Sequence, residues 1–263
     1  MNMLSIRGLG KNFGGLQVLQ DVDIEVQEGG ITGLIGPNGA GKTTVFNLAT
    51  GLLKPTTGRI SFLGRDITGM APHRITRLGI ARTFQNIRIF PEMTLLENVL
   101  VGRHHLLGYG AIGTLLATPA FREAERGARE RCLELLSWVR LDPKAGLTAD
   151  QLSYGEQRKL EFARALATEP KLLLLDEPAA GMNYGEAEGL KKQIRWLRDT
   201  FALAVVLVEH NMQVVMGVCE DIHVLDHGET IAHGAPEVVR KDPKVIAAYL
   251  GEDEEEAAKE VLP

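Results

Sequence analysis

The chain has 263 residues, of which 44% are hydrophobic and 24% charged, a composition typical of a soluble globular protein with one core or a core and a subdomain. Its longest apolar runs, such as 202–208, are far shorter than the roughly 20 residues of a membrane-spanning helix. The net charge of −5 argues against bulk nucleic-acid binding, and no charged and apolar leader opens the chain, so we expect a cytosolic protein.

The first predicted elements are strands. Apolar residues alternate with polar ones at 4–6, 22–26 and 59–62, which predicts a small layer of half-buried strands. From about residue 94 the pattern becomes helical, with Thr94 and Glu97 at capping-box spacing and Thr118 before a helix that starts with Pro119. The apolar face of that helix should contain Phe121, Ala124, Ala128, Cys132, Leu135 and Val139. A helical subdomain is therefore expected over 87–150.

The last predicted elements alternate between strand and helix. Apolar strands at 172–175, 203–208 and 222–225 alternate with helices near 154–168 and 184–200, which indicates parallel βαβ units. The α/β core is expected at 1–86 and 151–251, split around the helical insert, with a solvated acidic tail at 252–263. Cys132 and Cys219 are far apart and outside any metal-binding spacing, so we expect buried, reduced thiols.

Residues 36–44 contain a phosphate-binding pattern. The sequence Gly-Pro-Asn-Gly-Ala-Gly-Lys-Thr at 36–43 lies between an apolar strand pattern and an apolar helix pattern, as a P-loop does. Glycines allow backbone N–H groups to surround a phosphate chain, Lys42 would reach the β- and γ-phosphates, and Thr43 would bind Mg²⁺. The expected nucleotide-binding residues are Gly36, Pro37, Asn38, Gly39, Ala40, Gly41, Lys42, Thr43 and Thr44. The alternative is a chance glycine-rich turn.

Two carboxylates follow the apolar run at 172–175. Asp176 and Glu177 stand at the carboxyl end of a predicted parallel strand, where ligands bind in open α/β sheets. Asp176 would hold Mg²⁺, and Glu177 would orient and partly deprotonate an attacking water in phosphoryl transfer. Alone, the pair would be an ordinary strand end; a P-loop in the same chain favours the catalytic interpretation.

The sequence Leu-Ser-Tyr-Gly-Glu-Gln at 152–157 has capping-box spacing between Ser153 and Glu156 and by itself predicts a well-capped helix. It lies about 20 residues before Asp176, and it resembles the Leu-Ser-Gly-Gly-Gln signature of ATP-binding cassette (ABC) proteins. The resemblance covers the chain from Leu4 to about Gly251. It implies an α/β P-loop NTPase core with a small antiparallel β layer and an inserted α-helical subdomain, the ABC ATPase fold.

The resemblance also implies roles for individual residues. In this family two subunits form a head-to-tail dimer, so Ser153 and Gly155 would contact ATP bound to the P-loop of a second subunit. Phe13 matches the aromatic residue that stacks on adenine, and Gln85 matches the Q-loop glutamine that senses Mg²⁺ and the attacking water. His210 matches the switch histidine that contacts the γ-phosphate. Without the resemblance, Phe13 would be an ordinary core or surface residue and Gln85 a polar loop residue.

Finer features resemble one subfamily. The stretch 79–98, the insert 103–149 and the ending 248–251 look like the longer of two ATPases in branched-chain amino-acid importers, and urea and amide importers have close relatives. Asn183 stands where many cassettes have an Asp that contacts the partner. The resemblance implies ATP and Mg²⁺ as ligands and a peripheral place on the cytoplasmic face of the inner membrane. The implied partners are a second ABC ATPase subunit, transmembrane permease subunits and, indirectly, a periplasmic or extracellular binding protein.

Two other classes of protein remain as alternatives. A soluble cassette protein is one, although translation factors of this kind carry two cassettes and chromosome-maintenance ATPases contain long coiled coils, and the sequence has neither. A P-loop kinase or GTPase is the other, but it would not require the 152–157 motif, and the Asn-Lys-x-Asp guanine motif is missing from the sequence.

An apolar cluster near residue 90 predicts a docking surface. Between about 86 and 97 the apolar residues are too dense for an ordinary exposed loop, and arginines flank them. The cluster consists of Ile87, Ile89, Phe90 and Met93, with Arg82 and Arg88 beside it. The family resemblance indicates that a permease binds here. The alternative is that these side chains pack the helical insert against the core.

Overall fold

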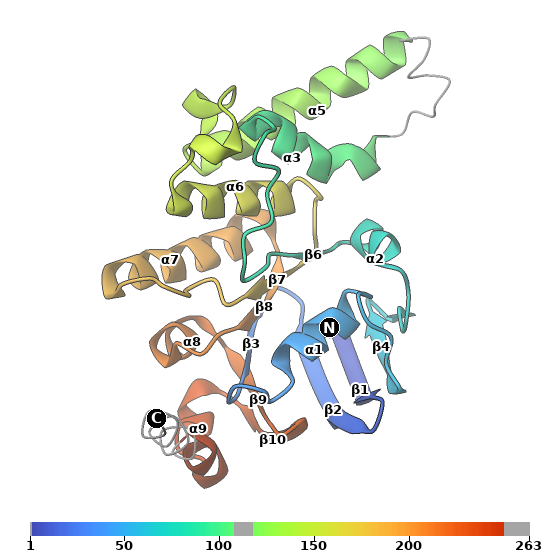
Figure 1. The fold of residues 1–263 in the computed structure, drawn as a ribbon, viewed down its shortest axis with the longest axis vertical. Coiled ribbons are helices and arrows are strands. Elements are labelled where there is room, and N and C mark those ends of the chain that lie inside the picture. Colours follow the sequence, from blue (N-terminus) through green and yellow to red (C-terminus); the bar gives the residue numbers. More distant parts are fainter. Residues whose placement is uncertain (1, 108–117, 250–263) are drawn as a thin grey trace, which may run out of the picture. The chain divides into compact units, whose positions relative to one another are not determined.

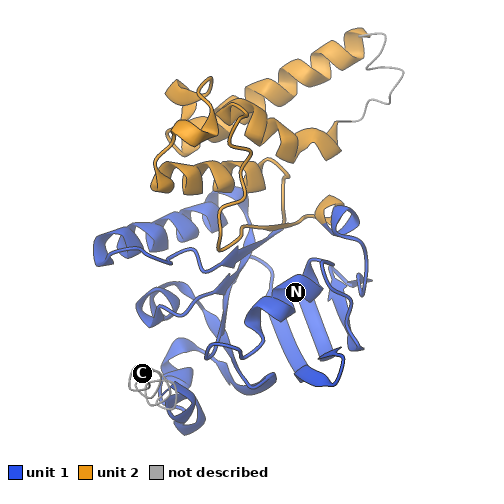
Figure 2. Cartoon of the chain, in the orientation of Figure 1, with its two compact units in different colours: residues 1–75, 172–263 blue, residues 76–171 orange. Residues whose placement is uncertain are grey.

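A computed structural model describes residues 2–107 and 118–249, and the acidic tail predicted at 252–263 lies outside the described residues. The chain forms two compact units, one of residues 1–75 and 172–263 and the other of residues 76–171 (Figure 2). The second unit is wider than the predicted insert at 87–150. The difference arises because helix α6 (Tyr154–Leu166) packs with the helices of the insert, although the sequence placed it in the α/β core.

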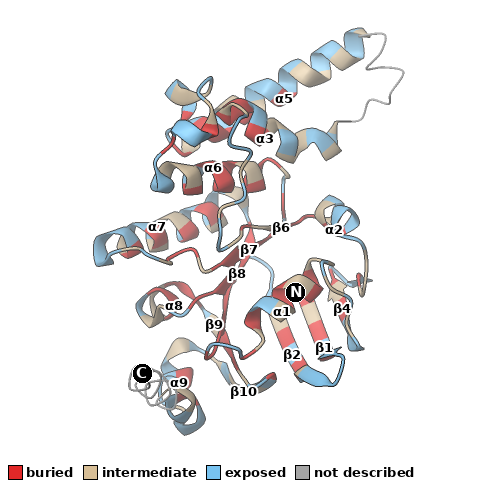
Figure 3. Ribbon diagram, in the orientation of Figure 1, coloured by how far each residue is buried: buried red, intermediate tan, exposed pale blue. Residues whose placement is uncertain are grey.

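The first unit contains a parallel sheet. Its strands lie in the order β10-β9-β3-β8-β7, where β3 is Ile31–Ile35, β7 Leu172–Asp176, β8 Ala204–Val208, β9 Asp221–Asp226 and β10 Glu229–Gly234. Strands β3, β7, β8 and β9 are parallel, as the alternation of strands and helices predicted, and β10 adds an antiparallel edge that was not predicted. Every residue of β3, β7 and β8 is buried (Figure 3), since helices cover both faces of a parallel sheet.

Helices flank this sheet. Helix α1 (Lys42–Ala49) lies along one side of it, and α7 (Tyr184–Phe201) and α8 (Met212–Val218) lie along the other (Figure 1). Asn183 begins α7: its Oδ1 accepts from the Glu186 N–H at 3.1 Å, and the Glu186 carboxylate accepts from the Asn183 N–H at 2.8 Å. Helix α9 (Pro236–Val239) and a helix over 243–249 complete the described chain.

The first unit also contains the predicted antiparallel β layer. Strands β1 (Asn2–Phe13), β2 (Leu16–Gln27), β4 (Thr57–Phe62) and β5 (Arg65–Asp66) form a sheet in the order β2-β1-β4-β5. The alternating apolar residues point to its buried face: Leu4, Ile6, Val22, Ile24, Val26, Ile60 and Phe62 are each at most 3% exposed. This layer presents the hairpin end that carries Phe13.

The second unit is mainly helical. It contains residues 76–78 of α2 (Pro72–Leu78), β6 (Ile80–Arg82), α3 (Leu95–Arg103), α5 (Pro119–Trp138) and α6, with short 3₁₀ turns at His104–Leu106, Asp142–Lys144 and Ala149–Gln151. Thr94 and Glu97 form the predicted capping box of α3, and Thr118 caps α5 as expected. Cys132 and Cys219 are buried free thiols, and burial raises their pKa values to about 11 and about 12.

Among the described residues, every helix is too short or too polar to cross a lipid bilayer.

Candidate active site

The P-loop joins β3 to α1 and requires glycine at defined positions. Gly36, Gly39 and Gly41 have φ values of 147°, 81° and 101°, which favour glycine. A Cβ on Gly36 would lie 2.0 Å from the Leu225 carbonyl oxygen, and one on Gly41 would lie 2.5 Å from Leu19 Cδ2. The backbone therefore curls closely enough that only glycine fits, as expected of a phosphate cradle.

Lys42 folds back over this loop. Its side chain is 7% exposed, and Nζ donates hydrogen bonds to the carbonyl oxygens of Gly36 at 2.6 Å and Pro37 at 2.7 Å. Thr43 follows it in the first turn of α1, where backbone N–H groups lack helical partners and favour anions. The loop thus combines a held ammonium group with a helix N-terminus.

Strand β8 lies between the P-loop strand and the strand that ends in Asp176. Leu34 of β3 pairs with Val208, and Val208 pairs with Asp176. Strands β3 and β7 are therefore not neighbours, but their parallel carboxyl ends share one edge of the sheet. Asp176 is 4% exposed, so its carboxylate is a buried oxygen ligand at that edge, suited to a hard cation such as Mg²⁺.

Glu177 adopts a strained backbone conformation beside His210. Its φ of 46° is uncommon for a residue with a side chain, and such strain concentrates at functional sites. Its N–H donates to the Val208 carbonyl oxygen at 2.9 Å, which fixes the turn after β7. Glu177 Oε2 lies 3.7 Å from His210 Nδ1, and the His210 side chain is 59% exposed. The two predicted catalytic side chains therefore meet at the open edge of the sheet.

Glu209 is a buried residue that links the two loops that carry Glu177 and His210, a role not predicted from the sequence. It is 0% exposed and accepts N–H bonds from Ala179 at 2.6 Å, His210 at 3.1 Å and Asn211 at 3.1 Å. Burial raises the pKa of its carboxyl, and the three N–H groups oppose that shift. An acidic residue directly after an apolar strand was the available signal.

Replacement of Glu209 by Gln should disturb both stability and hydrolysis. The amide would turn an NH₂ group toward at least one of the backbone N–H donors, and each buried N–H group left without an acceptor costs about 1–3 kcal/mol. We expect a lower midpoint of urea unfolding and slower ATP hydrolysis. Glu237→Gln, an exposed change on α9, is the control. Unchanged unfolding and hydrolysis in Glu209→Gln would contradict this linking role.

Phe13 is placed on the β layer with its ring accessible. It ends β1 and is 45% exposed, and Lys11 Nζ lies 4.9 Å from the ring centroid. An exposed ring is available to stack on a base, so the predicted adenine contact stays a prediction.

Ser153 and Gly155 lie at the start of α6 in the helical unit. Glu156 Oε2 accepts from the Ser153 N–H at 3.2 Å and from its hydroxyl at 3.0 Å, while Oε1 pairs with Lys144 Nζ at 2.5 Å. The pair with Lys144 and the bonds from Ser153 lower the pKa of Glu156 to about 2. A Cβ on Gly155 would meet nothing within 4 Å. Glycine weakens a helix, so the stability of α6 does not explain why residue 155 is a glycine. The close approach of another molecule to this position would explain it.

Gln85 is exposed in the loop between β6 and α3, and two buried polar residues hold that loop. Glu161, 1% exposed, accepts from the N–H groups of Phe84 at 3.3 Å and Arg88 at 3.4 Å. Asn98, 0% exposed, accepts from the Phe90 N–H at 2.9 Å and donates to the carbonyl oxygens of Phe90, Met93 and Thr94. Neither residue is predictable from the sequence as a loop anchor, because Glu and Asn within helices usually face solvent.

Comparison with known proteins gives consistent matches. A family described as ABC transporter matches residues 19–180, and one described as branched-chain amino acid ATP-binding cassette transporter matches residues 229–255. The high-affinity branched-chain amino acid transport ATP-binding protein LivG of Salmonella typhimurium is 46% identical over 250 residues, covering 95% of this chain and 98% of LivG.

Solved structures share the fold. The ADP conformation of an ATP-binding cassette of an ABC transporter superposes with a TM-score of 0.83 at 33% identity, covering 95% of this chain and 99% of that one. A dimeric post-hydrolysis cassette bound to ADP and phosphate superposes with a TM-score of 0.74 at 26% identity, covering 89% and 99%.

Proposed function

This chain belongs to the ABC transporter family, and on that premise we propose that it is the ATP-hydrolysing subunit of an importer for branched-chain amino acids. The meeting of Glu177 and His210 at the same sheet edge as the P-loop carries the hydrolytic part of the proposal. The C-terminal match at 229–255 and the 46% identity to LivG support the substrate class.

Each residue of the site has its own role in ATP hydrolysis. The P-loop N–H groups and Lys42 bind the phosphates, and Thr43 with Asp176 would hold Mg²⁺. Bound Mg²⁺ supplies charge neutralisation on the phosphate oxygens. Glu177 orients the attacking water and accepts its proton, and His210 hydrogen-bonds the γ-phosphate. Phosphoryl transfer to water depends mainly on such positioning.

The site is complete only with a second cassette. Ser153 and Gly155 would face the γ-phosphate bound by a partner, and the open space around Gly155 supports such an approach. Asn183 caps α7, so any contact that it makes across the dimer would come from an amide already engaged in its own helix. We place the assembly on the cytoplasmic face of the inner membrane, with permease subunits and, indirectly, a periplasmic binding protein.

A permease would bind the loop around Phe90. Phe90 is 45% exposed, while Ile87, Ile89 and Met93 are half-buried. The cluster therefore packs partly against the protein and partly faces solvent. Arg88 is exposed, with its guanidinium carbon 4.3 Å from the Phe84 ring centroid. Asn98 and Glu161 hold the backbone of this loop, and a rigid loop suits the transmission of force.

The double change Phe90→Ala with Arg88→Glu should therefore abolish solute uptake in reconstituted vesicles while the ATPase activity of the isolated chain stays nearly intact. Leu147→Ala with Arg129→Glu, an exposed apolar and an exposed basic residue of the same unit, is the matched control. Equal loss of uptake and basal hydrolysis would show that the cluster is structural and that the permease binds elsewhere.

The substrate class is tested in the complex with its permease subunits. ATP hydrolysis should rise when a leucine-loaded binding protein is added and should not respond to one loaded with urea or a short amide. The reverse response would identify a urea or amide importer. Failure to copurify with any membrane subunit would favour a soluble cassette protein.

A further inference from the structure

Three potential metal ligands share one face of the β9–β10 hairpin. His223 of β9 lies directly opposite His233 of β10 in the antiparallel register. Asp221 precedes His223 by two residues on the same strand, so both side chains project from the same face. Hydrolysis as derived above uses none of the three.

Their ligand atoms converge. His233 Nε2 lies 2.8 Å from Asp221 Oδ2, and His223 Nε2 lies 3.5 Å from the same oxygen. The two imidazole rings are stacked, with centroids 4.0 Å apart, and one ligand atom from each residue lies within 4.8 Å of the others. Ligand atoms that lie about 2.0–2.1 Å from a tetrahedral metal are roughly 3.3 Å apart from one another. The two distances from Asp221 Oδ2 to the histidine nitrogens, 2.8 and 3.5 Å, lie on either side of that value.

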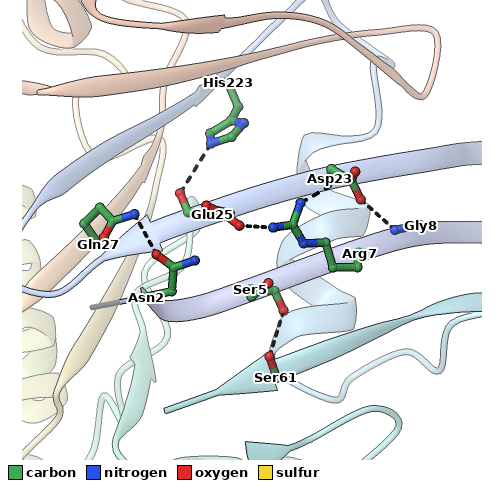
Figure 4. A network of polar contacts seen from close by, with 9 residues as sticks. All are labelled: Asn2, Ser5, Arg7, Gly8, Asp23, Glu25, Gln27, Ser61 and His223. Atoms are coloured by element: carbon green, nitrogen blue, oxygen red, sulfur yellow. Dashed lines mark hydrogen bonds and ion pairs between the residues drawn. The ribbon is translucent and has the colours of Figure 1, made fainter. Parts of the chain in front are cut away.

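One nitrogen of the buried histidine lacks a partner. His223 is 3% exposed; its Nε2 lies 3.3 Å from the Glu25 carbonyl oxygen (Figure 4), and its Nδ1 has no hydrogen-bond partner among the described residues. Because a carbonyl oxygen only accepts, the bond to Glu25 needs a proton on Nε2, the same nitrogen that faces Asp221 Oδ2, so a metal bound at Nε2 would replace this bond.

A solvent-accessible route leads to this cluster. A cavity of about 310 Å³ is lined in part by His223 and His233, and His233 is half-exposed. The nearby cation, Arg7, forms an ion pair with Glu25 and lies 3.9 Å from Asp23 (Figure 4), so two carboxylates offset its charge. A divalent ion could therefore enter without facing an uncompensated positive charge.

We propose that Asp221, His223 and His233 form a binding site for a divalent transition-metal cation of the Zn²⁺ class, with water at the open position. Two imidazoles and one carboxylate suit Zn²⁺, whereas Mg²⁺ and Ca²⁺ prefer oxygen ligands alone. The site backs the P-loop: β9 pairs with β3, with Leu34 beside His223, and Gly228 in the hairpin turn donates to the Ala40 carbonyl oxygen at 3.2 Å. A bound metal would cross-link β9 to β10, the two strands of the hairpin that supports the P-loop.

The test is calorimetric titration of Zn²⁺ into the full, nucleotide-free chain. The wild type should bind one more Zn²⁺ than His233→Gln, or bind it at least tenfold more tightly, and Asp221→Asn should weaken the same site. His227→Gln is the matched control, because His227 is a histidine of the same hairpin whose side chain is 96% exposed at the turn. It should bind as the wild type does.

Two further readouts separate this site from adventitious binding. Co²⁺ should develop the visible absorption bands of a tetrahedral site in the wild type and in His227→Gln but not in His233→Gln, and Zn²⁺ should raise the thermal midpoint in the same pattern. Zn²⁺ binding that is equal in wild type and His233→Gln, or no binding by the wild type, would overturn the proposal and leave the three residues as a hydrogen-bonded cluster.

Discussion

Glu177→Gln is expected to bind Mg-ATP with nearly wild-type affinity and to hydrolyse it about 10²–10⁴-fold more slowly, the usual contribution of a positioned general base. The backbone N–H bond from Glu177 to Val208 does not involve the side chain, so the turn should keep its geometry. The amide is isosteric with the carboxylate but accepts no proton. Single-turnover hydrolysis beside an ATP-binding measurement separates the two effects.

Trapped ATP in this variant should also hold two cassettes together. Light scattering should detect a dimer with Mg-ATP that Mg-ADP does not support, and Glu237→Gln, an exposed carboxylate of the same unit, should hydrolyse ATP normally. Hydrolysis within a few-fold of the wild type would remove Glu177 from the catalytic role. A monomer under saturating ATP would argue that a different cassette subunit is the partner.

Lys42→Ala is expected to abolish ATP binding at working nucleotide concentrations. Each charge-assisted hydrogen bond contributes about 1.5–3 kcal/mol, so loss of two bonds to phosphate would weaken binding by roughly 10²–10⁴-fold. The change also leaves the Gly36 and Pro37 carbonyl oxygens without the ammonium group that bridges them. The backbone cradle itself should remain, because glycine geometry and not Lys42 determines its shape.

Isothermal titration with ATP measures this effect directly. Lys192→Ala removes the same charge from an exposed position on α7 and should bind ATP as the wild type does. If Lys42→Ala bound ATP with nearly wild-type affinity, residues 36–44 would not be the nucleotide-binding site.

Much of the fold was predictable because its patterns are local. The alternation at 22–26 and the continuous apolar run at 172–175 report whether one or both faces of a strand are buried, and both predictions are confirmed. Caps at Thr94 and Thr118 depend on residues three positions apart, so the sequence contains both partners. The compact unit that contains the predicted helical insert also includes α6, because the packing of α6 against α3 and α5 depends on tertiary contacts.

The candidate site also combines features that the sequence predicts with features that depend on tertiary contacts. The sequence by itself determined the P-loop, since glycine spacing, Lys42 and the flanking strand and helix are contiguous, and it named the acidic pair at the end of β7. Only the tertiary structure decided that β8 separates β3 from β7, that Glu177 and His210 meet across two loops, and that Glu209 links those loops from inside. Likewise, Asp221, His223 and His233 become neighbours only through the register of a hairpin. The physical reason is that backbone propensity and periodicity act over a few residues, whereas strand order, burial of a carboxylate and cross-strand contacts are set by the packing of segments far apart in the chain.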